Sequence, residues 1–395
     1  FALAFVFGAV ANKANFCTMG ALSDVVNMGH WGRVRMWLLA IAVAIIGANL
    51  LHHGGQVDLM KTIYQRPMLP WLSLLLGGTL FGIGMTLAGG CVNKNLIRLG
   101  GGSLRSLVVV VFVAIAAYMT LEGLFGQWRA SWLDPVAIDL SAFGLKDQSL
   151  ATLLARLTGL PAGSVVLATA FVLAALLLAI VFSDKRFRGN AVQVLGATIL
   201  GLLVVAGWFL SGHLGYGENP ETLETVYFAT NTRTLEWMSF VAAAAYGPEL
   251  LMLWTDRSLH VSLGIATALG VVAGSFVVAL ATGNFRWEGF ASLEDLRNQL
   301  VGAVLMGFGG VTAMGCTVGQ GISGVSTLAI GSFIALAGIV AGAVAPPKLL
   351  ASPDSRAILQ REREGTLFAN VERRLSLTLE ALWHDDSLLV PYSTA

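Results

Sequence analysis

The sequence has few charged residues, few cysteines and none of the short motifs that mark nucleotide or metal sites. Charged residues make up 12% of its 395 residues and hydrophobic residues 56%. A soluble domain usually carries about 25% charged residues, so this chain has too few charges for a water-facing surface. It contains neither a P-loop of the form G-x-x-x-x-G-K-[ST] nor a C-x-x-C pair. We therefore expect no P-loop ATPase site, no metal site and no cofactor.

The charge balance and the cysteine count narrow the class further. The formal net charge is only +1, which gives no field that would attract nucleic acid. An odd number of widely separated cysteines forms no disulfide framework, so we expect free thiols at all three positions. The mean hydropathy is +0.74, which indicates that lipid is the solvent for most of the chain. The sequence begins at Phe1 inside an apolar run, and we expect residues to precede it.

Apolar runs predict an all-α, polytopic membrane protein of about nine transmembrane helices, in contact with the lipid bilayer. A span needs roughly 20 mostly apolar residues. Pro248 and Glu249 weaken one candidate, and Glu249 is the least expected charge within a span. The candidates are 1–16, 36–52, 70–90, 105–121, 163–182, 191–212, 237–254, 258–281, 298–315 and 324–345.

Basic residues set the expected orientation. Groups of Lys and Arg lie near 33–35, 94–105 and 185–188, and alternating spans place all three groups on the same side of the membrane. The positive-inside rule assigns that side to the cytoplasm. The loops 52–66 and 122–160 then face outward, as does the N-terminus. We predict a transmembrane transporter domain over 1–348 and a charged, amphipathic C-terminal tail over 349–395.

Two distant segments resemble each other and predict an internal repeat. Residues 77–95 match residues 301–320 after a shift of 225 positions, which superimposes four glycines and one cysteine. A shorter C-T-x-G match relates the start of the chain, at Cys17, to Cys316. The predicted repeat halves are about 1–121 and 191–345.

Each cysteine ends a glycine-rich apolar segment and is followed at once by polar residues. This pattern predicts broken or re-entrant helices, which are tolerated at membrane depth only where protein or a cavity satisfies the backbone. Transporters with internal repeats place their substrate at such breaks. The candidate substrate-binding residues are Cys17, Cys91, Cys316, Asn93, Lys94, Asn95, Thr317 and Gln320.

Neutral thiols suit the passage of a small sulfur-containing anion. The S–H group is a weak donor and a soft, polarizable partner, so it can bind an anion without trapping it. Conduction needs several such weak sites in series. Other interpretations stay open: a free cysteine can be a small buried hydrophobe, Asn93, Asn95 and Gln320 can cap helices, and Lys94 can be a cytoplasmic loop charge.

The segments around the cysteines resemble the YeeE/YedE family of membrane proteins. The similarity lies in Phe16-Cys17 with Gly20, in the run from Gly77 to Asn95 and in the run from Gly302 to Gly321. The resemblance implies nine spans in the bacterial inner membrane and uptake of thiosulfate. It further implies that Cys17, Cys91 and Cys316 pass thiosulfate along by transient S–H hydrogen bonds. A small cytoplasmic sulfur carrier of the TusA type is an implied partner.

Other functions remain to be separated from thiosulfate uptake. A related sulfur or selenium species is an alternative cargo. A membrane sulfurtransferase would form a cysteine persulfide and needs an activated thiolate, yet no histidine adjoins any cysteine in the sequence. A third alternative is a non-catalytic scaffold for sulfur-transfer proteins. We expect a transporter and not an enzyme.

Overall fold

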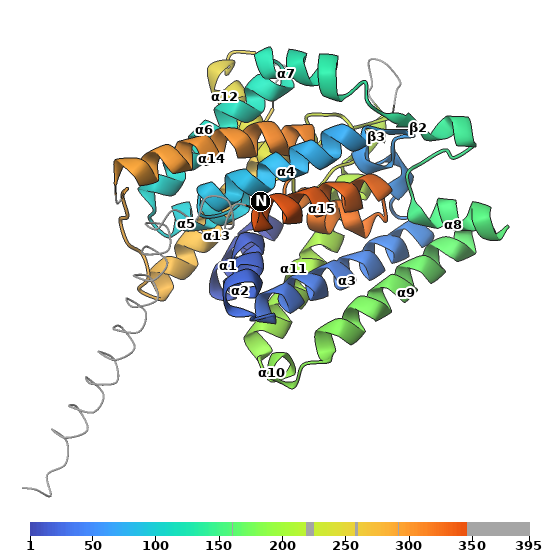
Figure 1. The fold of residues 1–395 in the computed structure, drawn as a ribbon, viewed down its shortest axis with the longest axis horizontal. Helices are drawn as coiled ribbons and strands as arrows, with labels where there is room; N and C mark the ends of the chain where they lie inside the picture. Colours follow the sequence, from blue (N-terminus) through green and yellow to red (C-terminus); the bar gives the residue numbers. More distant parts are fainter. Residues whose placement is uncertain (160, 219–224, 257–259, 291, 346–395) are drawn as a thin grey trace, which may run out of the picture. The chain divides into compact units, whose positions relative to one another are not determined.

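The computed structural model describes residues 1–159, 161–218, 225–256, 260–290 and 292–345, so the predicted tail over 349–395 lies outside the described residues. The described chain is almost entirely helical (Figure 1). Two short antiparallel pairs are the strands, β1 (Met68–Leu69) with β2 (Ile138–Asp139) and β3 (Tyr216–Glu218) with β4 (Thr225–Tyr227). The prediction of an all-α polytopic protein is confirmed.

Most of the longer helices occupy the predicted apolar runs. The longer helices are α1 (Ala2–Lys13), α2 (Thr18–Met28), α3 (Gly32–His53), α4 (Trp71–Leu87), α5 (Val92–Gly100), α6 (Leu104–Leu121), α9 (Ala162–Phe182), α11 (Ala191–Phe209), α12 (Phe240–Met252), α13 (Leu263–Ala281), α14 (Leu293–Thr312) and α15 (Ile330–Val344). Of these, α2 and α5 lie between the predicted runs, each directly after a cysteine. Shorter helical elements connect them, namely η1 (Leu59–Lys61), η2 (Ile63–Gln65), α7 (Leu124–Trp128), η3 (Arg129–Leu133), η4 (Leu140–Phe143), α8 (Leu150–Thr158), α10 (Lys185–Arg188), η5 (Leu210–Leu214) and η6 (Gly319–Gly324).

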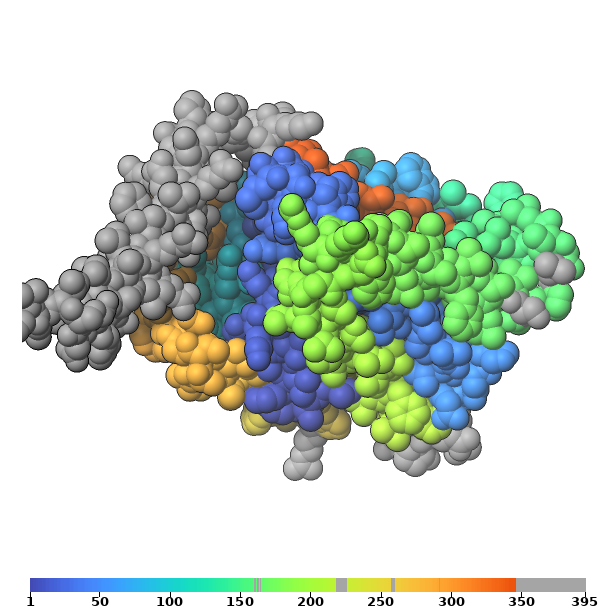
Figure 2. Space-filling model, turned by 90° about the horizontal axis from the view of Figure 1, so that it is seen from below, coloured from blue at the N-terminus to red at the C-terminus, as the bar shows by residue number. Residues whose placement is uncertain are grey.

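Length and composition identify the membrane spans. Among the described residues, seven helical segments are long and apolar enough to cross a bilayer, and α12 and α15 are shorter apolar helices. Two of the seven, Ala2–Met28 and Trp71–Gly100, each contain a helix pair separated by a cysteine-bearing break. On the face shown in Figure 2, the green segment that includes α9 lies against the blue N-terminal part of the chain. Large apolar side chains of α9 are exposed, as expected for a span that faces lipid, namely Phe171, Val172, Leu176 and Ile180.

The two repeat-like helices α4 and α14 pack against each other through their matched glycines. A Cβ atom added to Gly84 would lie 2.6 Å from the carbonyl oxygen of Gly302, and one added to Gly302 would lie 2.6 Å from the carbonyl oxygen of Gly84. Gly77 and Gly309 approach each other in the same reciprocal way, at 2.8 and 2.6 Å. The shift of 225 relates Gly77 to Gly302 and Gly84 to Gly309. The contact between Gly84 and Gly302 is therefore equivalent, under this shift, to the contact between Gly309 and Gly77. Such reciprocal contacts are typical of a two-fold relation between two similar segments.

All three breaks end their preceding helix with the same hydrogen bonds. The residue two before each cysteine has a left-handed backbone, with φ of 50° at Asn15, 66° at Gly89 and 54° at Met314. The N–H group of this residue donates to the carbonyl oxygen three residues earlier. The N–H group of the next residue donates to the carbonyl oxygen five residues earlier, as from Phe16 to Ala11, Gly90 to Met85 and Gly315 to Gly310. This is the Schellman termination of a helix. Two of the breaks use residues other than glycine, which costs of order 1–3 kcal/mol each and persists only where the surroundings enforce it.

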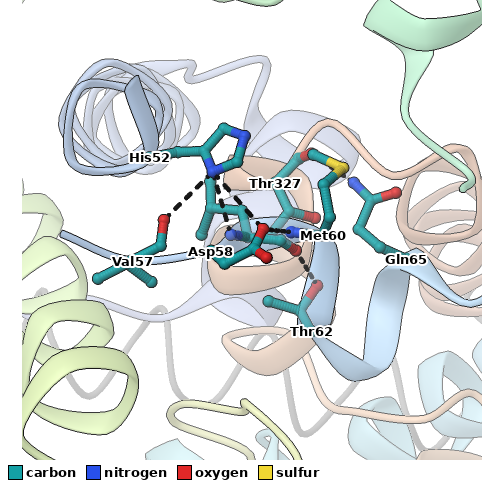
Figure 3. Close-up of polar contacts among 8 residues, drawn as sticks. His52, Val57, Asp58, Met60, Thr62, Gln65 and Thr327 are labelled. Atoms are coloured by element: carbon teal, nitrogen blue, oxygen red, sulfur yellow. Dashed lines mark hydrogen bonds and ion pairs between the residues drawn. The ribbon is translucent and has the colours of Figure 1, made fainter. Parts of the chain in front are cut away.

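The loop after α3 is held in place over the chain that follows Cys316. His52 Nδ1 lies 3.2 Å from the Val57 carbonyl oxygen and accepts a hydrogen bond from the Leu59 N–H at 3.3 Å (Figure 3). Gln65 donates from Nε2 to the carbonyl oxygen of Thr327 at 2.7 Å. The loop 54–65 is therefore anchored to the buried stretch that follows Cys316, and Tyr64 in η2 lies within electrostatic reach of Cys316.

Candidate functional site

Cys17 and Cys316 both cap the helical turn that follows them. Cys17 Sγ accepts a hydrogen bond from the Gly20 N–H at 3.3 Å, and Cys316 Sγ accepts one from the Gly319 N–H at 3.4 Å. The C-T-x-G sequence thus corresponds to one local structure, in which the cysteine sulfur accepts a hydrogen bond from the N–H group of the glycine three residues later. With its lone pair engaged, each buried sulfur keeps its S–H proton to donate elsewhere.

Cys91 lies within electrostatic reach of both other thiols. It is 2% exposed at the start of α5 and interacts electrostatically with both Cys17 and Cys316. Asn95 donates from Nδ2 to the carbonyl oxygens of Gly90 and Cys91, at 3.0 and 3.2 Å. Asn95 therefore fixes the turn that presents Cys91, which is the capping interpretation. The structure brings the three predicted cysteines into one buried region.

Several predicted polar residues retain unused hydrogen-bonding atoms around this region. Asn93 Oδ1, Thr317 Oγ1 and Gln320 Oε1 are all buried without a hydrogen-bond partner. The Thr317 hydroxyl faces the Cys91 thiol, although its geometry does not complete a hydrogen bond. An unpaired buried polar group costs about 1–3 kcal/mol. The two amide oxygens can only accept hydrogen bonds, as from a water molecule, whereas the Thr317 hydroxyl can donate one to an anion.

A cationic cluster lies at the end of the region that is predicted to face the cytoplasm. Lys94 donates from Nζ to Asn15 Oδ1 at 2.8 Å and interacts electrostatically with Cys17, Arg33 and Arg98. Arg33 pairs with Asp24 at 3.2 Å. Lys94 and Arg33 both lie close to Cys17, so Lys94 is part of a local group of cations beside that thiol.

The opposite end opens into a cavity of about 410 Å³, which we call the outer cavity. It lies among the loops that are predicted to face outward, and it reaches Gly315, the residue before Cys316. Two arginines and two carboxylates line it, and Arg129 pairs with Asp134 at 3.2 Å. Its lining includes Arg66, Arg129, Asp134, Glu236, Ser239 and Gly315.

Sequence reasoning missed Tyr64 and Glu236. Tyr64 is 2% exposed, and Glu236 lines the outer cavity. Tyr64 lies in η2 and Glu236 lies shortly before α12, and both are outside the matching segments 77–95 and 301–320, so no glycine or cysteine pattern marks them. Glu249, which the sequence analysis singled out, lies in α12 and does not line the outer cavity.

Gly20 keeps the Arg33 guanidinium close to Cys17. A Cβ atom added at Gly20 would lie 2.6 Å from Arg33 Nη1 and 3.6 Å from Cys17 Sγ. We predict that Gly20→Ala displaces the flexible end of Arg33 and slows anion uptake severalfold, while the protein still folds. Gly163→Ala is the control, because a Cβ there meets nothing within 4 Å. Equal uptake rates for the two variants would show that the position of Arg33 does not matter.

Comparison with known proteins gives the family. A sequence model of the family described as "Sulphur transport" matches residues 13–345. The thiosulfate transporter TsuA of Spirochaeta thermophila is 27% identical over 338 residues, which cover 84% of this chain and 92% of that protein. The thiosulfate transporter TsuA of Escherichia coli is 26% identical over 334 residues, which cover 80% of this chain and 84% of that protein. The chain is therefore a multi-pass membrane transport protein that belongs to the sulphur transport (YeeE/YedE) family.

Proposed function

We propose that this protein carries thiosulfate across the bacterial inner membrane into the cytoplasm, and that Cys316, Cys91 and Cys17 relay the anion in that order. Two relatives that match most of the chain are named thiosulfate transporters, which supports the cargo. The order follows from the predicted orientation, because Cys316 adjoins the outer cavity and Cys17 adjoins the cationic cluster.

The observation that carries this proposal is the burial of three thiols at three equivalent helix breaks between a cavity and a cationic mouth. All three cysteines are free and buried. Each follows a Schellman termination with a left-handed residue two positions before it. A purely packing role would not require the same type of break three times, twice at a residue other than glycine.

The chemistry of the lining suits a soft dianion. Thiols donate weakly, so each can hold the anion briefly and release it to the next. The Thr317 hydroxyl next to Cys91 adds a donor at the middle position, and the Asn93 amide adds polar atoms close by. Lys94 and Arg33 at the inner mouth attract the anion out of the membrane. A TusA-type carrier in the cytoplasm would then consume the delivered sulfur, and it stays a proposal on the basis of resemblance alone.

The test is uptake of ³⁵S-labelled thiosulfate into proteoliposomes that contain the full chain, followed by growth of a sulfur-uptake-deficient host on a panel of sulfur sources. We expect uptake of thiosulfate and growth on it. Unlabelled thiosulfate should compete with the label, and sulfate should compete poorly, because it lacks the terminal sulfur that a thiol lining favours. Absence of uptake by folded protein would contradict the proposal.

Mass spectrometry separates this function from a membrane sulfurtransferase. A relay that uses only hydrogen bonds leaves the cysteines chemically unchanged after transport. A persulfide on any of the three cysteines after incubation with thiosulfate would instead favour covalent sulfur transfer.

A further inference from the structure

Tyr64 has a buried hydroxyl group without a partner, close to the first cysteine of the proposed path. The side chain is 2% exposed, and its OH group makes no hydrogen bond with any residue that the structure describes. It lies in η2, and its ring packs edge-on against Trp208 with centroids 6.5 Å apart. Tyrosine hydroxyls usually find a partner when they are buried. An unpaired one therefore indicates a position that a ligand fills.

The Tyr64 hydroxyl lies close to both the outer cavity and Cys316. It interacts electrostatically with both the Cys316 thiol and the Glu236 carboxyl. Glu236 lines the outer cavity, whereas Tyr64 is sealed behind it. Because Ile63, the residue before Tyr64, and Gly315, the residue before Cys316, both line the outer cavity, the Tyr64 hydroxyl lies near the end of the cavity that is closest to Cys316.

The environment of Tyr64 is rigid, which suits a fixed binding group. Trp208 donates from Nε1 to Ser326 Oγ at 3.0 Å, and Ser326 in turn donates to the Ser323 carbonyl oxygen at 2.6 Å. Gln65, next to Tyr64, is anchored to Thr327. The tyrosine is therefore held from both sides by the buried stretch after Cys316, so its hydroxyl is preorganised.

Glu236 controls the charge of the outer cavity. With Arg66, Arg129 and Asp134 charged and Glu236 ionised, the formal charge of these four groups is zero. Protonation of Glu236 makes it +1. An arriving dianion meets a repulsive carboxylate in the first state and a net attraction in the second.

We propose that the Tyr64 hydroxyl is a substrate-binding donor that receives the divalent anion before Cys316, and that the anion reaches it when Glu236 is protonated. This inference rests on the proposed function and adds two residues to its path. Tyr64 provides the hydrogen bond, and Glu236 sets the charge at the approach.

The pKa of Glu236 places the change of its charge in the physiological pH range. Burial raises the pKa of Glu236 to about 7, and a hydrogen bond from Thr232 opposes part of that rise. The carboxyl is therefore protonated below pH 7 and ionised above it, so uptake should rise as pH falls. The other charged or titratable groups around it are Tyr64, Tyr246, Arg66, Arg129 and Asp134, with Glu122 and Glu249 beyond Tyr246.

The first experiment compares Tyr64→Phe with the wild type in proteoliposomes at pH 6. We expect the KM for thiosulfate to rise about tenfold or more, since a hydrogen bond to a charged group is lost. Thermal unfolding should be unchanged or slightly raised, because the substitution removes an unsatisfied hydroxyl. Tyr227→Phe, in β4 and away from the cavity lining, is the control. A wild-type KM for folded Tyr64→Phe would overturn the role of Tyr64.

The second experiment measures uptake from pH 6 to pH 8 with equal pH on both sides of the membrane. We expect wild-type uptake to fall severalfold across this range, whereas Glu236→Gln stays high and nearly flat. Retention of the wild-type pH profile by Glu236→Gln would overturn the role of Glu236. If uptake still depends on the cysteines but Tyr64→Phe and Glu236→Gln behave like the wild type, the roles of Tyr64 and Glu236 are refuted and the proposed function stands. Absence of wild-type uptake at every pH would instead refute the proposed function and, with it, this inference.

Discussion

Cys91→Ser should lower thiosulfate uptake by at least tenfold while the protein still folds. Cys91 interacts with both other thiols, so its loss separates the outer and inner halves of the proposed path. Serine keeps a donor, but its oxygen is smaller and harder than sulfur, so it contacts the terminal sulfur of thiosulfate less well. The measurements are initial uptake rates in proteoliposomes and growth on thiosulfate as the sole sulfur source.

Two controls separate transport from folding in this experiment. The amount of monodisperse protein after size-exclusion chromatography should match the wild type, because serine is close in size to cysteine. Growth on a sulfur source that enters by another transporter should also be normal. Wild-type growth of Cys91→Ser on thiosulfate would remove the thiol at position 91 from the mechanism.

A second large effect is expected at the contact between α4 and α14. Gly84→Val should prevent assembly of the protein, because even one Cβ atom would lie 2.6 Å from the Gly302 carbonyl oxygen and 2.8 Å from the Met306 nitrogen. Both neighbours are backbone atoms, so the helices themselves would have to separate. Overpacking of a well-packed core typically costs 1–3 kcal/mol or more. Helices in membranes depend on close approach at small residues, which makes the loss harder to recover.

The measurement is the yield of folded, detergent-solubilised protein and its melting temperature. Gly163→Val is the matched control, since an added Cβ there meets nothing within 4 Å and the residue is exposed in α9. We expect normal yield for the control and aggregated protein for Gly84→Val. Similar melting temperatures for both variants would show that the α4–α14 contact tolerates separation.

The helices and the cysteine breaks could be predicted because their causes are local. Apolar runs of span length specify membrane helices, and a glycine-rich run followed by Cys and polar residues specifies a break. The C-T-x-G match was a correct signal of shared geometry, since Gly20 and Gly319 supply the N–H groups that the cysteine sulfurs accept. The glycine match between residues 77–95 and 301–320 also indicated the segments that pack together.

The outer part of the site could not be predicted because its residues meet only through the tertiary fold. Tyr64 and Glu236 are 172 positions apart in sequence, and neither stands in a motif. They come close only because the loop 54–65 packs against the buried stretch that follows Cys316. Hydrogen bonds such as that from Gln65 to Thr327 hold the loop there. The role of Asn95 was ambiguous for a similar reason, because only coordinates show that its amide bonds to the Gly90 and Cys91 carbonyls.

The stretch from Gly315 to Ala329 is buried at every residue. No open water-filled channel runs along this stretch, because none of its residues is exposed to solvent. It contains no carboxylate, so a sodium or potassium ion that entered it would lose its water shell without gaining a counter-charge. On the proposed function, sulfur uptake would therefore proceed without a leak of these cations.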